Sequence, residues 1–346
     1  MRKLKKMERQ VVDSILQPAQ KKKKSNKLIS TGSTLLDLAI SGGISEVGGI
    51  PGGNIIEIFG PESVGKTAVL AEIAASIQSN GGDAKFMDAE ARLNKRYASI
   101  FGVNLNNKNY SRPDTVTDMF TDIRNWNPQT KSSNAINGIM ADSLASLTTN
   151  TEMSDNGDPY GMRRAKEFSE GLRKVCRLIA KNNWIIACSN QERQGPSGIT
   201  TPGGRGIPYY SSIRIRLSKM YARGKSWQIK KEKTIGNKKI IKIIGIATMA
   251  EVKKSSVDDP FRQAPIYIMF GYGIDDIRGN LQWYKDVTGG KKYNCVDANW
   301  STMDKAINHI ETNNLEKELK KMTIKKWHEI ETQFNPYITN RKKKAR

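Results

Sequence analysis

The stretch Asn54-Ile-Ile-Glu-Ile-Phe-Gly60-Pro-Glu-Ser-Val-Gly65-Lys66-Thr67 decides the fold. Its first six residues read as a buried strand, and a helix is expected from about Lys66 to Asn80. Between the two, residues 60–67 match the P-loop pattern G-x-x-x-x-G-K-[ST] at every fixed position. The glycines let backbone N–H groups surround phosphates, and the helix N-terminus favours their negative charge. We therefore expect a P-loop protein that binds ATP or a similar nucleotide.

The P-loop also predicts which side chains contact the nucleotide. Lys66 would reach the β- and γ-phosphates and is a predicted catalytic residue, while the Thr67 hydroxyl would bind Mg²⁺. The other nucleotide contacts are expected from Gly60, Pro61, Glu62, Ser63, Val64, Gly65 and Ala68. ATP and Mg²⁺ are therefore the predicted cofactors.

Outside the P-loop, strands alternate with helices and then give way to a strand-rich region. Further strands are expected at residues 84–88, 136–142 and 184–189, a helix at 161–182, and more strands at 212–220, 227–233, 238–246 and 266–270. Alternating strands and helices favour a mostly parallel sheet with helices on both faces. The predicted fold class is therefore α/β with a β-rich extension, followed by a helical tail from about Asp304.

Three polar residues end predicted strands and are candidates for chemistry on the phosphates. Asp142 could hold the hydration shell of Mg²⁺ beside the P-loop. Glu90 is the candidate base for the water that attacks the γ-phosphate, although an acid in a surface loop would look the same. Gln191, after Asn190, could donate a hydrogen bond to the γ-phosphate and link it to residues 192–206. That glycine-rich, basic loop suits single-stranded nucleic acid, and equally an ordinary surface loop.

The charge of the chain points to a polyanionic partner. Its 346 residues include 57 Lys+Arg and 34 Asp+Glu, a formal net charge of +23. Nucleic acid and an acidic membrane surface both fit this charge. Residues 1–27, the last six residues and a predicted hairpin at 223–242 hold much of the excess, which we expect to set nucleic-acid affinity and its salt dependence.

Other classes of protein are not expected. No run of about 18 apolar residues predicts a membrane span, and no apolar segment after the basic start predicts a secretory signal. Three dispersed cysteines and two histidines do not form a zinc or disulfide pattern. We therefore expect a cytoplasmic protein without a membrane partner.

Taken together, these motifs and their order are similar to those of the RecA/UvsX-type homologous recombinases. The resemblance rests on residues 29–37, 60–67, 86–90, 141–147, 190–191, 200–204, 211–214, 260–264 and 271–274. It spans roughly residues 28–285, with the P-loop as only one of its parts.

The resemblance implies a DNA-dependent ATPase that forms helical filaments on single-stranded DNA. Such filaments pair that strand with a homologous duplex and exchange strands. In this family the residue matching Glu90 activates the water, the one matching Gln191 senses the γ-phosphate, and the one matching Tyr97 stacks on adenine. A single-strand-binding protein and a loading mediator are further partners that the resemblance implies.

The resemblance also implies contacts with DNA and with neighbouring protomers. Two DNA-binding loops would correspond to residues 151–161 and 192–206. The expected DNA contacts are Arg163, Arg164, Arg193, Gly203, Gly204 and Arg205. Tyr209 would contact the next protomer, and Lys253 and Lys254 would reach that protomer's nucleotide. These two lysines are adjacent here, whereas bacterial RecA separates them by one residue.

The predicted domains are a basic N-terminal arm with a polymerisation helix (1–28), a RecA-like ATPase core (29–275) and a small α-rich C-terminal domain (276–346). The last six residues are basic, where bacterial RecA has an acidic tail. This divergence and the short basic N-terminus suggest a phage-encoded member that acts in the host cytoplasm.

Two other functions compete with recombination. One is a RecA-like ring helicase, for which residues 1–27 are too few to form the usual N-terminal domain. The other is a DNA-binding mediator that kept the fold and lost hydrolysis, against which the intact set of phosphate-site residues argues.

Overall fold

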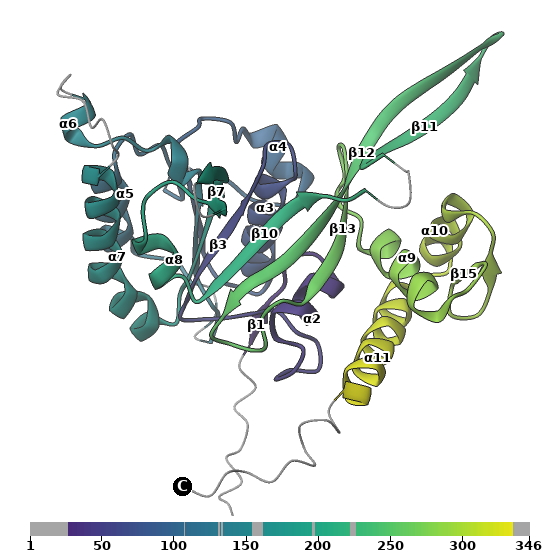
Figure 1. The fold of residues 1–346 in the computed structure, drawn as a ribbon. Helices are drawn as coiled ribbons and strands as arrows, with labels where there is room; N and C mark the ends of the chain where they lie inside the picture. Colours follow the sequence, from purple (N-terminus) through teal and green to yellow (C-terminus); the bar gives the residue numbers. More distant parts are fainter. Residues whose placement is uncertain are drawn as a thin grey trace, which may run out of the picture.

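The computed structural model describes residues 27–106, 108–130, 132, 134–153, 162–195, 198–221 and 226–334. The predicted polymerisation helix and the basic C-terminal tail lie outside these residues, as does most of the first predicted DNA-binding loop. Within the described ranges, the main feature is a ten-stranded sheet. Its strand order is β14-β13-β12-β10-β3-β7-β6-β4-β5, with β11 paired to β12 (Figure 1).

The half of the sheet that carries the P-loop is parallel. Its strands are β10 (Ile213–Lys219), β3 (Asn54–Gly60), β7 (Ile185–Gln191), β6 (Gly138–Asp142), β4 (Ala84–Asp88) and β5 (Tyr110–Ser111). β3 lies between β10 and β7 and is parallel to both. Six of the seven residues of β3 are buried, because helices cover both faces of the sheet. This burial explains why the sequence of β3 is almost continuously apolar.

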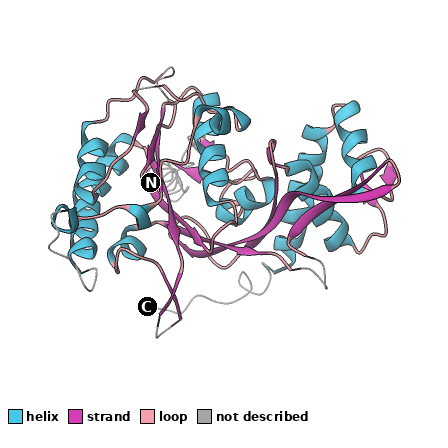
Figure 2. Cartoon of the chain, turned by 90° about the horizontal axis from the view of Figure 1, so that it is seen from above, coloured by secondary structure: helices cyan, strands magenta, loops and turns pink. Residues whose placement is uncertain are grey.

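Helices pack on the two faces of this sheet (Figure 2). One face is covered by α2 (Thr34–Ser41), α3 (Lys66–Ser79) and α4 (Lys95–Ile100), the other by α5 (Val116–Asn125), α7 (Met162–Asn182) and α8 (Gly206–Tyr210). α7 buries Phe168, Leu172, Val175 and Ile179, a spacing of four, three and four that places them on one helical side. The predicted α/β fold, with a mostly parallel sheet and helices on both faces, is confirmed.

Several further elements are short. They are β1 (Leu28–Ile29), β2 (Ile50–Pro51), η1 (Leu144–Ser146), α6 (Asn150–Met153), β8 (Arg193–Gly195), β9 (Gly198–Thr200), β15 (Tyr293–Asn294) and β16 (Asn299–Trp300). None of the helices in the described part of the chain is long and apolar enough to cross a membrane.

The antiparallel half of the sheet is the predicted β-rich extension. It consists of β11 (Gln228–Ile235), β12 (Lys238–Ser255), β13 (Gln263–Met269) and β14 (Gly273–Ile274). The sequence predicted a strand over 238–246, whereas β12 continues for 18 residues. Its second part contains Ala247 and Ala250, residues with weak strand preference, and pairing with β10 and β13 keeps it extended there.

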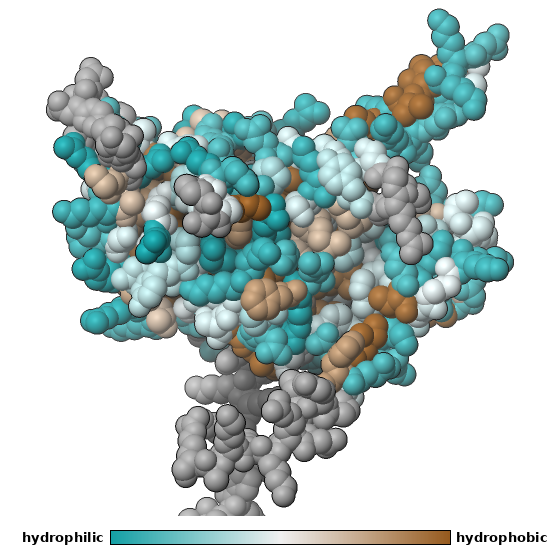
Figure 3. Space-filling model, viewed as in Figure 1, coloured by the Kyte–Doolittle hydropathy of each residue, from teal (hydrophilic) through white to brown (hydrophobic). Residues whose placement is uncertain are grey.

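β11 and the first part of β12 form a hairpin that projects from the body of the molecule (Figure 1). Four isoleucines of this hairpin are exposed: Ile235, Ile240, Ile241 and Ile243. Figure 3 shows hydrophobic patches, in brown, on the projecting hairpin. Gly236 has a φ of +60° in the turn at the tip, a left-handed conformation that favours glycine.

The C-terminal helices have a small core of their own. α9 (Asp276–Thr288), α10 (Met303–Thr312) and α11 (Glu316–Phe334) surround Leu281, Cys295, Ala306, Ile310 and Leu319. α11 also packs on the main body, where Trp327 contacts Leu38 and the Arg262 guanidinium lies 5.3 Å from the Trp327 ring centroid. On this basis we propose a domain division near residue 275.

Candidate nucleotide site

The loop after β3 has the conformation that a phosphate cradle needs. Gly65 has a φ of +90°, a left-handed conformation that favours glycine. A Cβ added to it would lie 2.0 Å from Ile268 Cδ1, so that side chain would also have to move. α3 begins at the next residue, which places the helix N-terminus at the loop.

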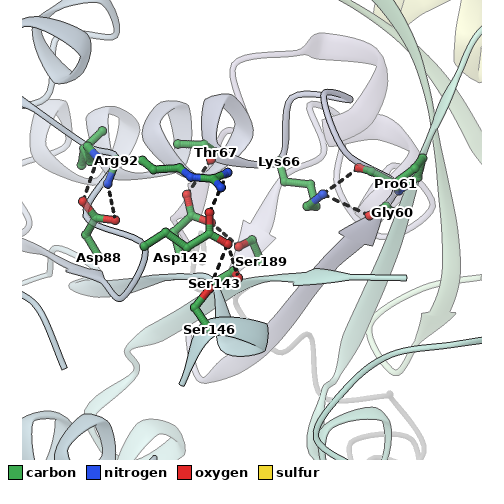
Figure 4. A network of polar contacts seen from close by, with 12 residues as sticks. Gly60, Pro61, Lys66, Thr67, Asp88, Arg92, Asp142, Ser143, Ser146 and Ser189 are labelled. Carbon is green, nitrogen blue, oxygen red and sulfur yellow. Dashed lines mark hydrogen bonds and ion pairs between the residues drawn. The ribbon is translucent and has the colours of Figure 1, made fainter. Parts of the chain in front are cut away.

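Lys66 folds back over the loop. Its Nζ donates to the carbonyl oxygens of Gly60 (3.0 Å) and Pro61 (2.7 Å) (Figure 4). Burial lowers the pKa of Lys66, and the carboxylates of Asp142 and Glu90 oppose that shift. Both acceptors are neutral carbonyls, so the positive charge of the ammonium stays available for a phosphate.

Thr67 and Asp142 meet at the carboxyl end of β6. Thr67 Oγ1 donates to Asp142 Oδ2 at 2.5 Å, and Ser189 Oγ donates to the other carboxylate oxygen (Figure 4). Burial raises the pKa of Asp142, and the two hydroxyl donors lower it in part. A hydroxyl next to a buried carboxylate is the kind of hard oxygen set that suits Mg²⁺, so these residues fit the predicted metal.

Glu90, the candidate base, is held by three side chains. Its Oε1 accepts from Ser143 Oγ (2.7 Å) and Ser146 Oγ (3.0 Å), and its Oε2 lies 2.7 Å from Arg92 Nη1. No role was expected for these three partners from the sequence. Ser143 and Ser146 could have been found, because both follow the strand that ends at Asp142 and lie in residues 141–147, which carry part of the resemblance, whereas Arg92 carried no signal.

One cleft brings most of the predicted nucleotide residues together. It encloses about 310 Å³ and is lined by Glu62, Ser63, Val64, Gly65, Lys66, Thr67, Ala68, Glu90, Arg92, Tyr97, Asp142, Ser143 and Gln191. Gln191 reaches it because β7 pairs with β3 in a register that sets Gln191 opposite Gly60. The three predicted catalytic residues thus lie in the same cleft.

Three predicted residues lie elsewhere on the chain. Lys254 Nζ donates to the carbonyls of Pro208 (2.8 Å) and Tyr209 (2.9 Å), and Lys253 pairs with Glu251 at 2.7 Å. Tyr209 is 75% exposed. Lys254 and Tyr209 therefore share one surface, and none of these residues lines the cleft of its own chain.

The predicted DNA contacts on the second loop differ in exposure. Arg193 and Arg205 are exposed, on the β8–β9 hairpin and at the start of α8. Gly203 is buried, and a Cβ added to it would lie 2.3 Å from Ile207 Cδ1, so this glycine serves packing. Gly204 is exposed, with a φ of +72°.

The two arginines expected to contact DNA near the first loop are in the first turn of α7. Arg164 Nη1 donates to the carbonyls of Ala145 (3.4 Å) and Leu147 (3.3 Å). This arginine therefore joins α7 to the segment that carries Ser143. Arg163 is exposed in the same turn.

A buried ion pair connects the P-loop strand to the second loop. Glu57 of β3 is fully buried, and its Oε2 lies 2.6 Å from Arg214 Nε. Asn190 Nδ2 donates to Glu57 Oε1 (3.0 Å) and to the carbonyl of Pro202 (3.0 Å). This cluster was not predicted, although a single glutamate inside an apolar strand is a visible signal in the sequence.

Comparison with known proteins identifies the family. The model of the RecA N-terminal domain matches residues 1–275. The protein RecA of Clostridioides difficile (strain 630) is 37% identical over 286 residues, which are 81% of this chain and 75% of that protein. The protein RecA of Staphylococcus aureus (strain JH9) is 36% identical over 258 residues, 71% of this chain and 66% of that protein. These matches confirm the resemblance seen in the sequence: the chain belongs to the RecA family.

Proposed function

We propose that this chain is an ATP-dependent recombinase that forms helical filaments on single-stranded DNA and exchanges strands with a homologous duplex. The observation that carries the proposal is the convergence of Lys66, Thr67, Glu90, Asp142 and Gln191 on one cleft in a RecA-family chain. A protein that only bound DNA would not need all five.

In this proposal the loop and the start of α3 hold the phosphates of ATP. Lys66 leaves the carbonyls of Gly60 and Pro61 for the β- and γ-phosphates, a small movement of one flexible side chain. Thr67 and Asp142 hold Mg²⁺, with Asp142 acting through water. The metal ion would neutralise charge on the phosphate oxygens.

Glu90 takes a proton from the attacking water. Ser143 and Ser146 fix one carboxylate oxygen, and Arg92 pairs with the other. These three contacts orient the carboxylate, so that it can take up a proton from a water held beside the γ-phosphate.

Gln191 couples the phosphates to the DNA-binding loop. It lies in the cleft, and the loop begins at the next residue. Its neighbour Asn190 is bonded to Pro202 inside the loop. A shift of Gln191 when the γ-phosphate leaves would therefore move the loop that binds DNA.

A second copy of the chain completes the proposed assembly. Tyr209 and Lys254 share an exposed surface outside the cleft, as expected for residues that face a neighbour. Homologous duplex DNA, a single-strand-binding protein and a loading mediator are the further proposed partners. Phage origin and location in the host cytoplasm stay predictions.

The proposal is tested by ATP hydrolysis and electron microscopy. We expect single-stranded DNA to stimulate ATPase activity, and open helical filaments to form on that DNA with a slowly hydrolysed ATP analogue. Closed hexameric rings would instead support the helicase. DNA binding without any ATPase activity would support the mediator.

The projecting hairpin predicts part of the salt dependence. Residues that lie opposite each other on β11 and β12 are on the same face of the hairpin. One of the two faces has no acidic residue and consists of Lys231, Lys233, Ile235, Lys238, Ile240 and Lys242. Lys231 on this face already pairs with Asp304 of the C-terminal helices at 3.4 Å. We expect replacement of the four lysines by glutamine to reduce the slope of log K against log[salt] for single-stranded DNA by up to about 2, because each of the other three releases a counterion that contributes about 0.7. Fluorescence anisotropy over a salt series measures this slope.

The opposite face of the hairpin provides the control. It carries Lys230 and Lys239, and Lys239 pairs with Glu232 at 3.0 Å. Replacing these two lysines by glutamine should change the slope by about 1 or less, since one is already neutralised. Equal slopes for the two variants would show that the acid-free face does not contact DNA.

A further inference from the structure

A second cavity adjoins the phosphate cleft. It shares four lining residues with that cleft: Ser63, Gly65, Ala68 and Tyr97. It encloses about 410 Å³ and continues away from the phosphate residues, along Ile268, Met269 and Phe270 at the end of β13. A molecule whose phosphates lie on the loop therefore has room to extend into it.

The far wall of this cavity is the root of the projecting hairpin. Trp227, Gln228, Ile243 and Ile246 line it there. The cavity thus lies between α4, which carries Tyr97, and a hairpin that is 130 residues later in the chain (227 − 97). The fold places two aromatic side chains, one from each element, in the walls of the same chamber.

Trp227 is held in place from two directions. Its carbonyl oxygen accepts from the Ala247 N–H at 2.7 Å, which ties the residue to β12. Lys219 Nζ lies 4.7 Å from its ring centroid, a cation–π distance. The side chain is half-buried and packs against the main core. Such a ring is a pre-formed surface and loses little conformational entropy when a ligand binds.

The chemistry of the two cavities differs in the way a nucleotide requires. The phosphate cleft offers an ammonium, a hydroxyl and carboxylates, whereas this chamber offers aromatic rings, isoleucines and one amide. A purine base presents flat faces to aromatic side chains and polar edges to an amide. An apolar chamber with few polar groups is typical of a site for such a ligand.

We propose that the hairpin root is the far wall of the nucleoside site, with Trp227 as the residue that determines affinity for the base. This inference rests on the proposed function in one respect, namely that the P-loop binds the phosphates of ATP. It adds that the projecting hairpin belongs to the nucleotide site of its own chain. A bound base then restrains β12, the strand that also carries Lys253 and Lys254.

Two probes separate the base from the phosphates. We would measure by calorimetry the binding of Mg-ADP and of inorganic tripolyphosphate to the full chain and to Trp227→Leu. Loss of an aromatic contact with the base should weaken ADP binding about 10-fold, and tripolyphosphate binding should stay within twofold of the wild type. Trp227→Phe keeps an aromatic ring and should recover most of the ADP affinity.

Trp300→Leu is the matched control. Trp300 is half-buried in β16 and does not line the chamber, so its ADP affinity should equal that of the wild type. Equal ADP affinity of Trp227→Leu and wild type would overturn the inference. If Trp227→Leu bound neither ADP nor tripolyphosphate, the inference would also be overturned, because the ring would then stabilise the fold rather than contact the base.

Failure of the proposed function would look different. If the wild-type chain bound neither probe, the P-loop would not be a nucleotide site. If it bound tripolyphosphate and ADP equally, the chamber would have no role while the P-loop kept its own.

Discussion

Replacing Lys66 by alanine is expected to lower the kcat of ATP hydrolysis by about 10²- to 10³-fold, the usual effect of removing one pre-positioned donor to developing negative charge. The ammonium already lies at the loop, on the carbonyls of Gly60 and Pro61. Alanine leaves the cleft, Thr67 and Asp142 in place. A DNA-stimulated ATPase assay at saturating ATP measures the loss.

DNA binding by the same variant should change little. Lys66 is one of 57 basic residues, and charge attracts DNA over the whole surface. Lys317→Ala, which removes an exposed lysine from α11, is the control for loss of one positive charge and should keep full activity. Normal turnover by Lys66→Ala would refute the proposed catalytic site.

Replacing Glu90 by glutamine is expected to lower kcat by about 10²- to 10⁴-fold, the range for removal of a general base. Glutamine keeps the shape and can still accept the hydrogen bonds of Ser143 and Ser146, but it cannot take a proton from water. Affinity for the ATP analogue should therefore be retained. Single-turnover hydrolysis together with analogue binding separates the two effects.

Glu318→Gln on α11 is the charge control, since that acid is exposed and does not line the cleft. It should hydrolyse ATP at the wild-type rate. If Glu90→Gln also did so, the base would have to be another residue, and Glu90 would only bind its serine and arginine partners.

The sequence predicted the elements whose signal is local. The P-loop could be predicted because the positions of its glycines and its lysine are set by local geometry within eight residues, 60–67. α7 was visible because its buried residues recur with a helical period. α2 was not predicted, since all eight of its residues are buried, Thr34, Asp37 and Ser41 included, so that no exposed polar face gives the segment a helical period. α9 was also missed, because only three of its residues are buried and one of them is Gly279.

Contacts between distant parts of the chain could be predicted only where the parallel sheet itself brings residues together. Glu90, Asp142 and Gln191 each ended a predicted strand, so their meeting followed from the parallel sheet. The partners of Glu90 depend on the directions of side chains in a loop, and a periodic sequence pattern does not predict those directions. Trp227 lines the chamber because of the register in which β11 pairs with β12, and no sequence pattern predicts that register.

The buried carboxylate of Glu57 has a consequence for how the second loop can vary. The side-chain amide of Asn190, before the loop, donates both to Glu57 and to the carbonyl of Pro202, near the end of the loop. Arg214 binds the other oxygen of the Glu57 carboxylate. Breaking such a buried pair is costly, so both ends of the segment are fixed. Glu192 and Thr201 also bind arginines of β10, since Arg216 Nε lies 2.9 Å from Glu192 Oε2 and Arg214 Nη2 donates to Thr201 Oγ1 at 3.4 Å. Between these two residues Arg193–Gly195 pairs with Gly198–Thr200, and doubling the length of a loop costs only about 0.6 kcal/mol. Residues 193–200 can therefore be exchanged for a loop of another length and composition while the core keeps its packing.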